Sequence, residues 1–158
     1  MSLRPLPLPA GVPGRVWLHA MPGRREAWSD FETLARAAGL TRIVCLTPWR
    51  EVEAGSPEYA QAIERQQLPC RWQSLPMADF GLHADAQAFA DGVRDLARAV
   101  QNGESVLLHC AHGIGRTGTV AACVLKCLGL DTEDALHTVQ RAGSNPQSAL
   151  QSGWVDAF

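Results

Sequence analysis

The sequence predicts an α/β fold with a central, mainly parallel sheet that is flanked by helices on both faces. Two observations predict this architecture. Short apolar runs of strand length alternate with longer runs whose apolar residues recur at helical spacing, and the connections between them are short. In addition, 46% of the 158 residues are hydrophobic, which is enough for one domain to bury a core without disulfides or metal.

Four segments have the apolar runs or the turn-forming boundaries that are typical of strands. In chain order, these expected strands are 15–23, 41–48, 68–77 and 104–110. The second segment ends at Pro48, and the third is expected to be half-buried. The last, "ESVLLHC", is the most apolar strand candidate in the chain.

Six segments have helical spacing of apolar residues or helix-boundary signals. In chain order, these expected helices are 29–40, 56–67, 85–101, 116–130, 131–143 and 146–158. Ser29 is the expected cap of the first helix and Gly39 its stop, and the second has a proline in its first turn. The fifth has a capping-type start at Asp131 or Thr132. The fourth is apolar enough to be largely buried.

Two parts of the chain are expected to behave differently. The proline-rich residues 1–14 predict an extended N-terminal lead-in that packs loosely, and residues 15–158 predict a single domain. The longest apolar run, Val120 to Leu125, is far too short to span a bilayer, and the opening residues lack the apolar stretch of a signal peptide. We therefore expect a cytoplasmic protein that does not bind membranes.

The charge and the cysteine count exclude several kinds of partner and cofactor. A formal net charge of −2 provides no general attraction to nucleic acid, so anions must be recognised locally. Five cysteines, an odd number, favour reduced thiols over a disulfide framework. The histidines and cysteines show no metal-ligand pairing, so no metal or other cofactor is expected. We expect a monomer.

The segment "HCAHGIGRTG", residues 109–118, joins the most apolar strand to the buried helix. In parallel sheets, ligands bind beyond the carboxyl ends of strands, which is where Cys110 is expected. Gly113 and Gly115 permit backbone conformations that let N–H groups surround a tetrahedral anion, and the following helix adds its free N–H groups. Arg116 offers a planar fork that matches two phosphate oxygens. The segment therefore predicts an anion-binding loop.

A cysteine inside such a loop is a candidate nucleophile. The donors that bind an anion also stabilise the Cys110 thiolate when the loop is empty. The hydroxyl of Thr117 is placed to donate to the sulfur and to ease its departure in a second step, although an ordinary first-turn residue is the alternative. For His109 we consider two related roles, a buried histidine that fixes the loop backbone and a residue that thereby tunes the thiolate.

This loop resembles the signature loop of the cysteine-dependent protein tyrosine and dual-specificity phosphatase superfamily, His-Cys-x5-Arg-Ser/Thr-Gly. The arrangement of elements is most similar to small microbial and cyclin-dependent-kinase-associated dual-specificity-like members. The resemblance implies a three-layer sandwich, a phosphatase domain at 15–158, and phosphoryl transfer to Cys110 followed by hydrolysis of the thiophosphate. It implies a phosphate-binding set of Ala111, His112, Gly113, Ile114, Gly115 and Arg116.

Expelling an alkoxide or phenoxide from phosphate requires a proton donor on a nearby loop. The best candidate is Asp79 in "LPMADFGLH", which follows an expected strand and lies 31 residues before Cys110. That placement is similar to the general-acid loop of the superfamily, although Met77 and Ala78 replace the family's tryptophan and proline. Asp85 is the alternative acid, but its more natural task is to cap the helix that starts there.

The resemblance implies two further roles. The water-positioning glutamine of many members corresponds to Gln151, with Gln147 as a competing position. Some relatives protect the nucleophile by a disulfide to a nearby strand cysteine, and Cys45 is the candidate here.

The expected substrate is a phosphorylated protein. Ala111, His112 and Ile114 carry at most one partial positive charge, whereas relatives that prefer phosphoinositides often place lysines in this loop. We expect hydrolysis of phosphotyrosine, with phosphoserine and phosphothreonine as further candidates. The alternatives are a phosphatase of a non-protein substrate such as a phosphoinositide, a non-catalytic phosphopeptide-binding module, and a sulfurtransferase or arsenate reductase.

Overall fold

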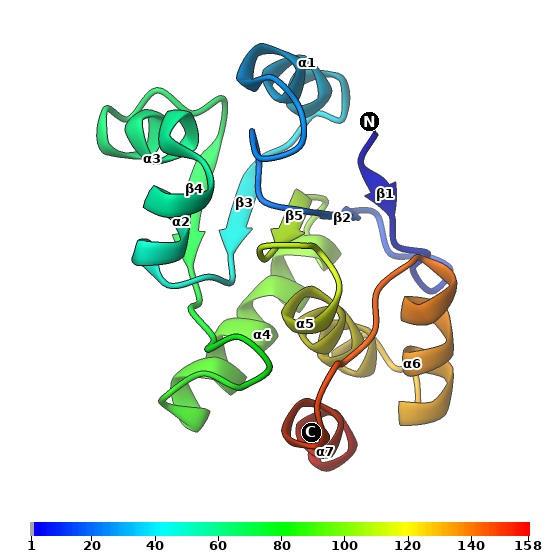
Figure 1. The fold of residues 1–158 in the computed structure, drawn as a ribbon. Helices are drawn as coiled ribbons and strands as arrows, with labels where there is room; N and C mark the ends of the chain where they lie inside the picture. The colour runs from blue at the N-terminus through cyan, green and yellow to red at the C-terminus, as the bar shows by residue number, and fades with distance from the viewer. Residues whose placement is uncertain (1) are drawn as a thin grey trace.

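The computed structural model describes residues 2–158, whose centre is one five-stranded sheet (Figure 1). The strands lie in the order β1-β2-β5-β3-β4. Strands β2, β5, β3 and β4 are parallel, and β1 pairs with β2 in the antiparallel direction at the edge. The strand bounds are β1 (Arg4–Pro5), β2 (Arg15–His19), β3 (Arg42–Cys45), β4 (Arg71–Ser74) and β5 (Ser105–His109). The predicted, mainly parallel sheet is confirmed.

Helices cover both faces of this sheet, so the predicted three-layer arrangement is also confirmed. Their bounds are α1 (Trp28–Ala37), α2 (Trp49–Gly55), α3 (Pro57–Glu64), α4 (Ala86–Gln101), α5 (Gly115–Cys127), α6 (Thr132–Arg141) and α7 (Ala149–Ala157). Helices α1 to α3 pack on one face, and α4 to α7 pack on the other (Figure 1). Within residues 2–158, every helix is too short or too polar to cross a membrane.

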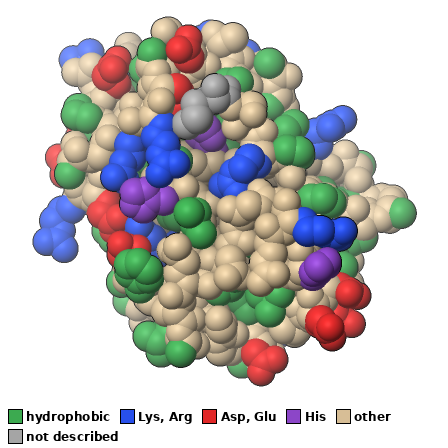
Figure 2. All heavy atoms as spheres, turned by 45° about the vertical axis from the view of Figure 1, so that its right-hand side comes forward, with side chains coloured by type: hydrophobic (Ala, Val, Ile, Leu, Met, Phe, Trp, Pro, Cys, Tyr) green, Lys and Arg blue, Asp and Glu red, His purple; other side chains and the backbone are tan. Residues whose placement is uncertain are grey.

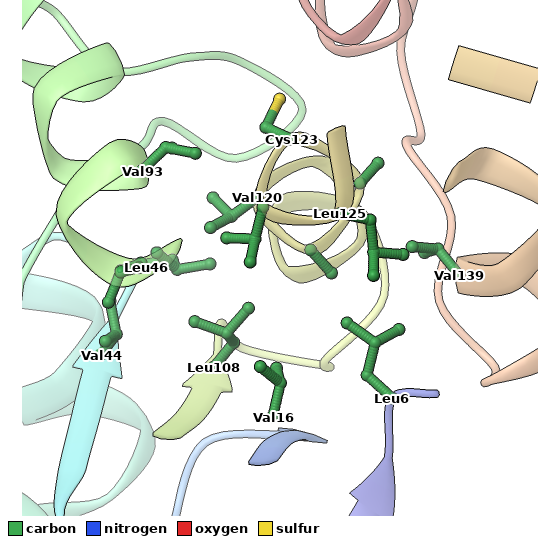
Figure 3. Close-up of a cluster of buried hydrophobic side chains, with 14 of the residues drawn as sticks. Leu6, Val16, Val44, Leu46, Val93, Leu108, Val120, Cys123, Leu125 and Val139 are labelled. Atoms are coloured by element: carbon green, nitrogen blue, oxygen red, sulfur yellow. The ribbon is translucent and has the colours of Figure 1, made fainter. Parts of the chain in front are cut away.

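Strand β5 is buried along its whole length between the two helical layers. Val106 and Leu108 belong to the cluster with α4 and α5, whereas Leu107 packs with α1 and α3 on the opposite face. Figure 3 shows Leu108 on the sheet below Val120 of α5. Burying a leucine side chain stabilises a fold by roughly 1.5–3 kcal/mol. This central strand therefore anchors the loop that follows it.

The N-terminal residues are extended, but the expectation that they pack loosely is wrong. Leu3 and Leu6 are 7% and 3% exposed and belong to the two core clusters on opposite faces of the sheet. Arg4 and Pro5 form β1, which continues the sheet beyond β2. Apolar burial on both faces outweighs the irregularity that the prolines introduce. These residues are thus part of the same domain.

Most helix boundaries agree with the sequence signals, with two exceptions. Helix α1 begins before Ser29, with Ala27 at its N-cap and no side-chain cap, so the expected Ser29 cap is wrong. Helix α2 was not expected at all, because Pro48 marked only the end of a strand; the same proline is the N-cap of α2. The capping role expected at Asp131 is confirmed, since its carboxylate accepts the Asp134 N–H at 2.8 Å.

Candidate active site

Cys110 directly follows the central strand and is 3% exposed. Its Sγ accepts hydrogen bonds from Thr117 Oγ1 at 3.1 Å and from the Gly113 N–H at 3.3 Å. Donors of this kind favour a negatively charged sulfur over a neutral thiol. The sulfur therefore lies in a loop that offers it hydrogen-bond donors, and Thr117 lies where the sequence places its hydroxyl.

The backbone of the phosphate loop, residues 110–116, has its carbonyls turned outward to the surrounding scaffold. Ala111 O accepts the Met21 N–H at 3.2 Å, and Ile114 O accepts the Asn145 N–H at 3.1 Å. Gly113 O accepts hydrogen bonds from Arg4 Nη2 at 2.6 Å and from Ser144 Oγ. In a planar trans peptide, the C=O and the next N–H point in opposite directions. The N–H groups of His112, Ile114 and Gly115 therefore point into the loop, an arrangement typical of backbone nests that bind anions.

Gly113 is required by this backbone path. Its φ of +76° lies in the left-handed region, and a Cβ there would approach the His19 carbonyl within 2.6 Å. A side chain would therefore be strained and would also clash with the end of β2. The loop reaches its conformation only because residue 113 has no side chain.

His109 is completely buried and connects the loop to helix α3. Its Nδ1 lies 3.1 Å from Cys110 O, and its Nε2 lies 2.7 Å from the Tyr59 hydroxyl. The Trp72 indole N–H donates to that hydroxyl at 3.0 Å. Because the Cys110 carbonyl can only accept, Nδ1 carries a proton, and in the neutral ring Nε2 accepts the Tyr59 O–H. Desolvation by burial lowers its pKa to about 4.

This buried histidine predicts a pH-dependent stability. Because the folded-state pKa is about 4 and the usual value is 6.5, the unfolded chain binds the extra proton between these values. We expect His109 to reduce the free energy of unfolding by about 3 kcal/mol as the pH falls from above 6.5 to 4.

Denaturant unfolding at a series of pH values measures this slope. The variant His109→Asn, whose amide can still donate to Cys110 O, should show a shallower loss of stability than the wild type. His137→Gln, which alters an exposed histidine on α6, is the matched control and should keep the wild-type slope. Equal slopes for His109→Asn and the wild type would contradict the prediction.

Arg116 closes the loop and is held by a partner that the sequence analysis missed. Its Nη1 and Nη2 each lie 2.9 Å from one oxygen of Glu51 on α2, and its side chain is 2% exposed. Burial alone lowers the pKa of Arg116, but the hydrogen bonds and charge of Glu51, with the charges of Cys110 and Asp79, raise it overall. The guanidinium is thus a fixed positive charge in a set orientation.

The contacts of Arg116 leave one edge of its fork for a ligand. Nη1 also donates to Met77 O at 3.1 Å, so Glu51 and Met77 use both Nη1 hydrogens and one on Nη2. The remaining donors are the Nε–H and the second Nη2–H, which lie side by side on the same edge. Two parallel N–H groups match two oxygens of a phosphate.

Glu51 orients the Arg116 guanidinium through two hydrogen bonds, and Glu51→Gln can keep only part of this contact. We therefore expect the variant to bind anions more weakly. For Glu51→Gln we expect kcat/KM for an aryl phosphate to fall about tenfold, and the inhibition constant of inorganic phosphate to rise by a similar factor. The free energy of unfolding should change by less than about 1 kcal/mol, since Glu51 is one-third exposed. Glu53→Gln, at an exposed position of the same helix, is the control. An inhibition constant identical in all three proteins would exclude this role for Glu51.

Asp79 lies on the loop after β4, beside the phosphate loop. Its Oδ1 is 3.5 Å from Arg116 Nη2, and its side chain is 58% exposed. The adjoining turn is closed by a Gly81 N–H to Ala78 O bond of 2.8 Å and contains Phe80 at a φ of +56°. The structure therefore brings an exposed carboxyl group close to Arg116, beside the loop that contains Cys110.

The alternative acid, Asp85, is engaged elsewhere. It is the N-cap of α4, where its Oδ1 accepts the N–H groups of Gln87 and Ala88 at 3.0 and 3.1 Å. This is the capping task that the sequence analysis considered more natural for it. Among the two aspartates, only Asp79 contacts the arginine of the phosphate loop.

The two glutamines considered for positioning water lie in different surroundings. Gln151 is fully buried, and its amide spans from Gly81 O, at 3.1 Å, to the Gln147 N–H, at 2.9 Å. It therefore ties α7 to the loop that carries Asp79. The Gln147 side chain lies against Gly115 of the phosphate loop, where its Oε1 is 2.6 Å from the place of a Cβ. The water-positioning role of Gln151 stays a prediction.

Cys45 and Cys110 are both free thiols in the structure. Cys45 ends β3 beside His109, but it belongs to the core cluster with α1 and α3, whereas Cys110 belongs to the opposite cluster. The Cys45 Sγ instead lies 3.2 Å from Thr47 Oγ1, and burial raises its pKa. Side chains on opposite faces of a sheet do not meet without backbone movement.

Several residues that support the site carry little local sequence signal. Glu51 was missed together with α2, although a glutamate three residues after Pro48 fits the first turn of a helix. Tyr59 reads as an ordinary core residue of its helix. Arg4 and Ser144 contact Gly113 from opposite ends of the chain, which no local pattern can indicate.

Comparisons with known proteins agree with this geometry. A family model described as "Swiss Army Knife protein, DSP-PTPase phosphatase domain" matches residues 12–152. Dual specificity protein phosphatase 22 of mouse and of human is 31% identical to the chain over 84 residues, which is 51% of this chain and 46% of that protein. The chain spans about half the length of these curated relatives.

Solved structures resemble the chain in fold. A kinase associated phosphatase with serine in place of its catalytic-site cysteine has a TM-score of 0.82 and 20% identity, covering 100% of this chain and 93% of that chain. The active form of Tk-PTP has a TM-score of 0.67 and 22% identity, covering 99% and 95%. At these identities the likeness concerns the fold alone.

Proposed function

The chain belongs to the Swiss Army Knife family of DSP-PTPase phosphatase domains, and from this premise we propose that it hydrolyses phosphate monoesters on proteins through a cysteinyl-phosphate intermediate. The observation that carries the proposal is the approach of Asp79 Oδ1 to Arg116 Nη2, at 3.5 Å. A loop containing Cys110 and Arg116 binds phosphate by itself. A carboxyl group beside it adds the proton donor that turnover requires.

In the first step, the inward N–H groups and the free edge of Arg116 bind the three terminal oxygens of the phosphate. The Cys110 thiolate attacks phosphorus from the floor of the loop, so an S–P bond forms while the P–O bond to the leaving group breaks. Asp79 donates its proton to the departing oxygen. The products of this step are the free alcohol or phenol, the Asp79 carboxylate and the phosphorylated cysteine.

In the second step, water replaces the leaving group and attacks phosphorus. The Asp79 carboxylate accepts a proton from this water, a P–O bond forms and the S–P bond breaks. The electron pair returns to Cys110 Sγ, where Thr117 Oγ1 at 3.1 Å and the Gly113 N–H at 3.3 Å stabilise the departing thiolate. Inorganic phosphate leaves, and Asp79 is protonated again for the next cycle.

The proposed substrate is a phosphorylated protein, with phosphotyrosine as the preferred residue. The loop side chains around the phosphate are Ala111, His112 and Ile114, of which only His112 is polar. This lining offers no lysines for the additional phosphates of an inositol headgroup. Residues 78–80 of the loop that carries Asp79 are exposed, which suits a substrate residue carried on a polypeptide.

The test is phosphate release from a panel of substrates at equal concentration. The panel contains an aryl phosphate, matched phosphotyrosyl, phosphoseryl and phosphothreonyl peptides, and a short-chain phosphoinositide. We expect the aryl phosphate and the phosphotyrosyl peptide to have the highest kcat/KM. A higher kcat/KM for the phosphoinositide would indicate a non-protein substrate. Phosphopeptide binding without any turnover would indicate a binding module.

A further inference from the structure

A surface pocket of about 310 Å³ adjoins the phosphate loop on the side away from Asp79. Two residues of the phosphate loop, His112 and Ile114, form one wall of the pocket. The other lining residues come from the N-terminal segment, the end of β2 and the loop after it, and the turn after α6; they are Ser2, Arg4, His19, Ala20, Arg25 and Gly143. Figure 2 shows arginine and histidine side chains gathered on one face of the molecule.

The strand order explains why these segments meet. Strand β2 is the neighbour of β5 and runs parallel to it, so the loop after β2 lies at the same edge as the phosphate loop. Strand β1 runs the other way, so its beginning, with Arg4, reaches that edge too. Strand β4, which leads to Asp79, lies at the opposite end of the sheet. The phosphate loop is therefore flanked by an acid on one side and by the basic pocket on the other.

The arginines of the pocket lack carboxylate partners. The ion pairs within residues 2–158 join other arginines to acids, and neither Arg4 nor Arg25 has a carboxylate oxygen within 4.0 Å. The nearby Glu26 is buried and bonded to His19. Two unneutralised guanidinium groups at one pocket, in a chain with a net charge of −2, create a local site for anions.

The two arginines contribute in different ways. Arg4 uses three N–H contacts to hold the scaffold, two of them to Ala142 O at 2.8 Å and to Gly113 O at 2.6 Å, so it supplies a fixed charge. Burial lowers the pKa of Arg4, while the charge of Cys110 raises it and that of Arg25 lowers it. Arg25 is exposed and donates to His112 Nδ1 at 3.0 Å, so the rest of its fork faces the solvent.

We propose that this pocket, which we call the Arg4–Arg25 pocket, binds a second phosphate group of the same substrate while the first lies on Cys110. The proposal rests on the proposed function and narrows its substrates to phosphoproteins that carry two phosphorylated residues close together. A phosphate suits the site because its oxygens accept two N–H groups from a guanidinium fork at once. His112 belongs to both sites and links them.

The test compares a phosphotyrosyl peptide with versions that carry a second phosphorylated residue at each neighbouring position in turn. For the wild type, we expect kcat/KM to be about tenfold higher for the best doubly phosphorylated peptide. In Arg25→Ala the ratio of doubly to singly phosphorylated substrate should fall to near one. Arg24→Ala removes the adjacent exposed arginine, which does not line the pocket, and should keep the wild-type ratio.

A second measurement tests the pocket without any peptide. Propane-1,3-diyl bisphosphate and propyl phosphate are compared as competitive inhibitors of aryl phosphate hydrolysis. We expect the bisphosphate to inhibit about tenfold more strongly than the monophosphate, and this advantage to vanish in Arg25→Ala but to persist in Arg24→Ala.

The outcomes separate the two proposals. If phosphopeptides are not hydrolysed but the bisphosphate advantage depends on Arg25, the assignment to phosphoproteins fails and the pocket binds the second phosphate of a small molecule. If phosphopeptides are hydrolysed but both ratios are near one in the wild type, the proposed function stands and the second phosphate site is overturned. Ratios that are high but unaffected by Arg25→Ala would also overturn it.

Discussion

Replacing Cys110 by serine is expected to lower kcat for aryl phosphate hydrolysis by on the order of 10⁴-fold or more, because a serine hydroxyl at this position has no base to activate it. The sulfur receives hydrogen bonds only from donors, Thr117 Oγ1 and the Gly113 N–H, and these stabilise a thiolate without removing a proton from an alcohol. The N–H groups of the loop and Arg116 are unchanged in the variant. Inorganic phosphate should therefore bind Cys110→Ser within a few-fold of the wild-type affinity.

The measurement combines steady-state hydrolysis with calorimetric titration of inorganic phosphate. Rapid acid quench of the wild type during turnover should trap a phosphorylated cysteine, and the variant should trap none. Cys70→Ser, which changes a half-buried free thiol next to β4, is the control and should retain full activity. Full activity of Cys110→Ser would exclude the cysteinyl-phosphate mechanism altogether.

Replacing Asp79 by asparagine is expected to lower kcat by about 10² to 10⁴-fold for substrates with poor leaving groups, such as alkyl or phenyl phosphates. A leaving group that is stable as an anion needs no proton, so the loss should shrink as the leaving group becomes more acidic. The measurement is kcat for a series of aryl and alkyl phosphates whose leaving groups differ in acidity.

Asp85→Asn is the matched control for this experiment. Asparagine caps a helix as well as aspartate, so the hydrogen bonds to Gln87 and Ala88 can persist and the stability should change little. Its rates should equal those of the wild type for every leaving group. If Asp85→Asn instead shows the loss that grows with poorer leaving groups while Asp79→Asn does not, the two residues exchange roles and the Asp79 loop has another task.

The site could be predicted from the sequence where its parts are adjacent in the chain. "HCAHGIGRTG" contains the proposed nucleophile, three glycines, an arginine and a hydroxyl within ten residues, so its spacing alone indicates an anion loop. Asp79 could be placed because a parallel sheet brings the carboxyl ends of its strands to one edge. Helix α2 could not be predicted with the same ease, because its seven residues are too few to show a periodic apolar stripe.

The supporting contacts depended on tertiary packing. Glu51 reaches Arg116 across 65 residues of sequence, Tyr59 reaches His109 across 50, and Arg4 reaches Gly113 across 109. Each of these contacts requires two elements to be packed at a particular distance, and a hydrophobic pattern does not specify that distance. The N-terminal residues show the same limit. Their prolines predicted a loosely packed segment, but Leu3 and Leu6 are buried in the core.

The sequence by itself determined the chemistry that we propose for this protein, because the proposed nucleophile, the backbone of the proposed phosphate site and the arginine lie on one short continuous segment whose conformation follows from its glycines and from the strand and helix around it. Only the tertiary structure decided how that chemistry is held and directed. Glu51 orients the fork of Arg116, His109 is neutral because burial removes it from water, and Arg4 and Arg25 converge beside the loop. Local patterns report local conformation, whereas orientation, desolvation and the convergence of charges arise when distant segments pack together.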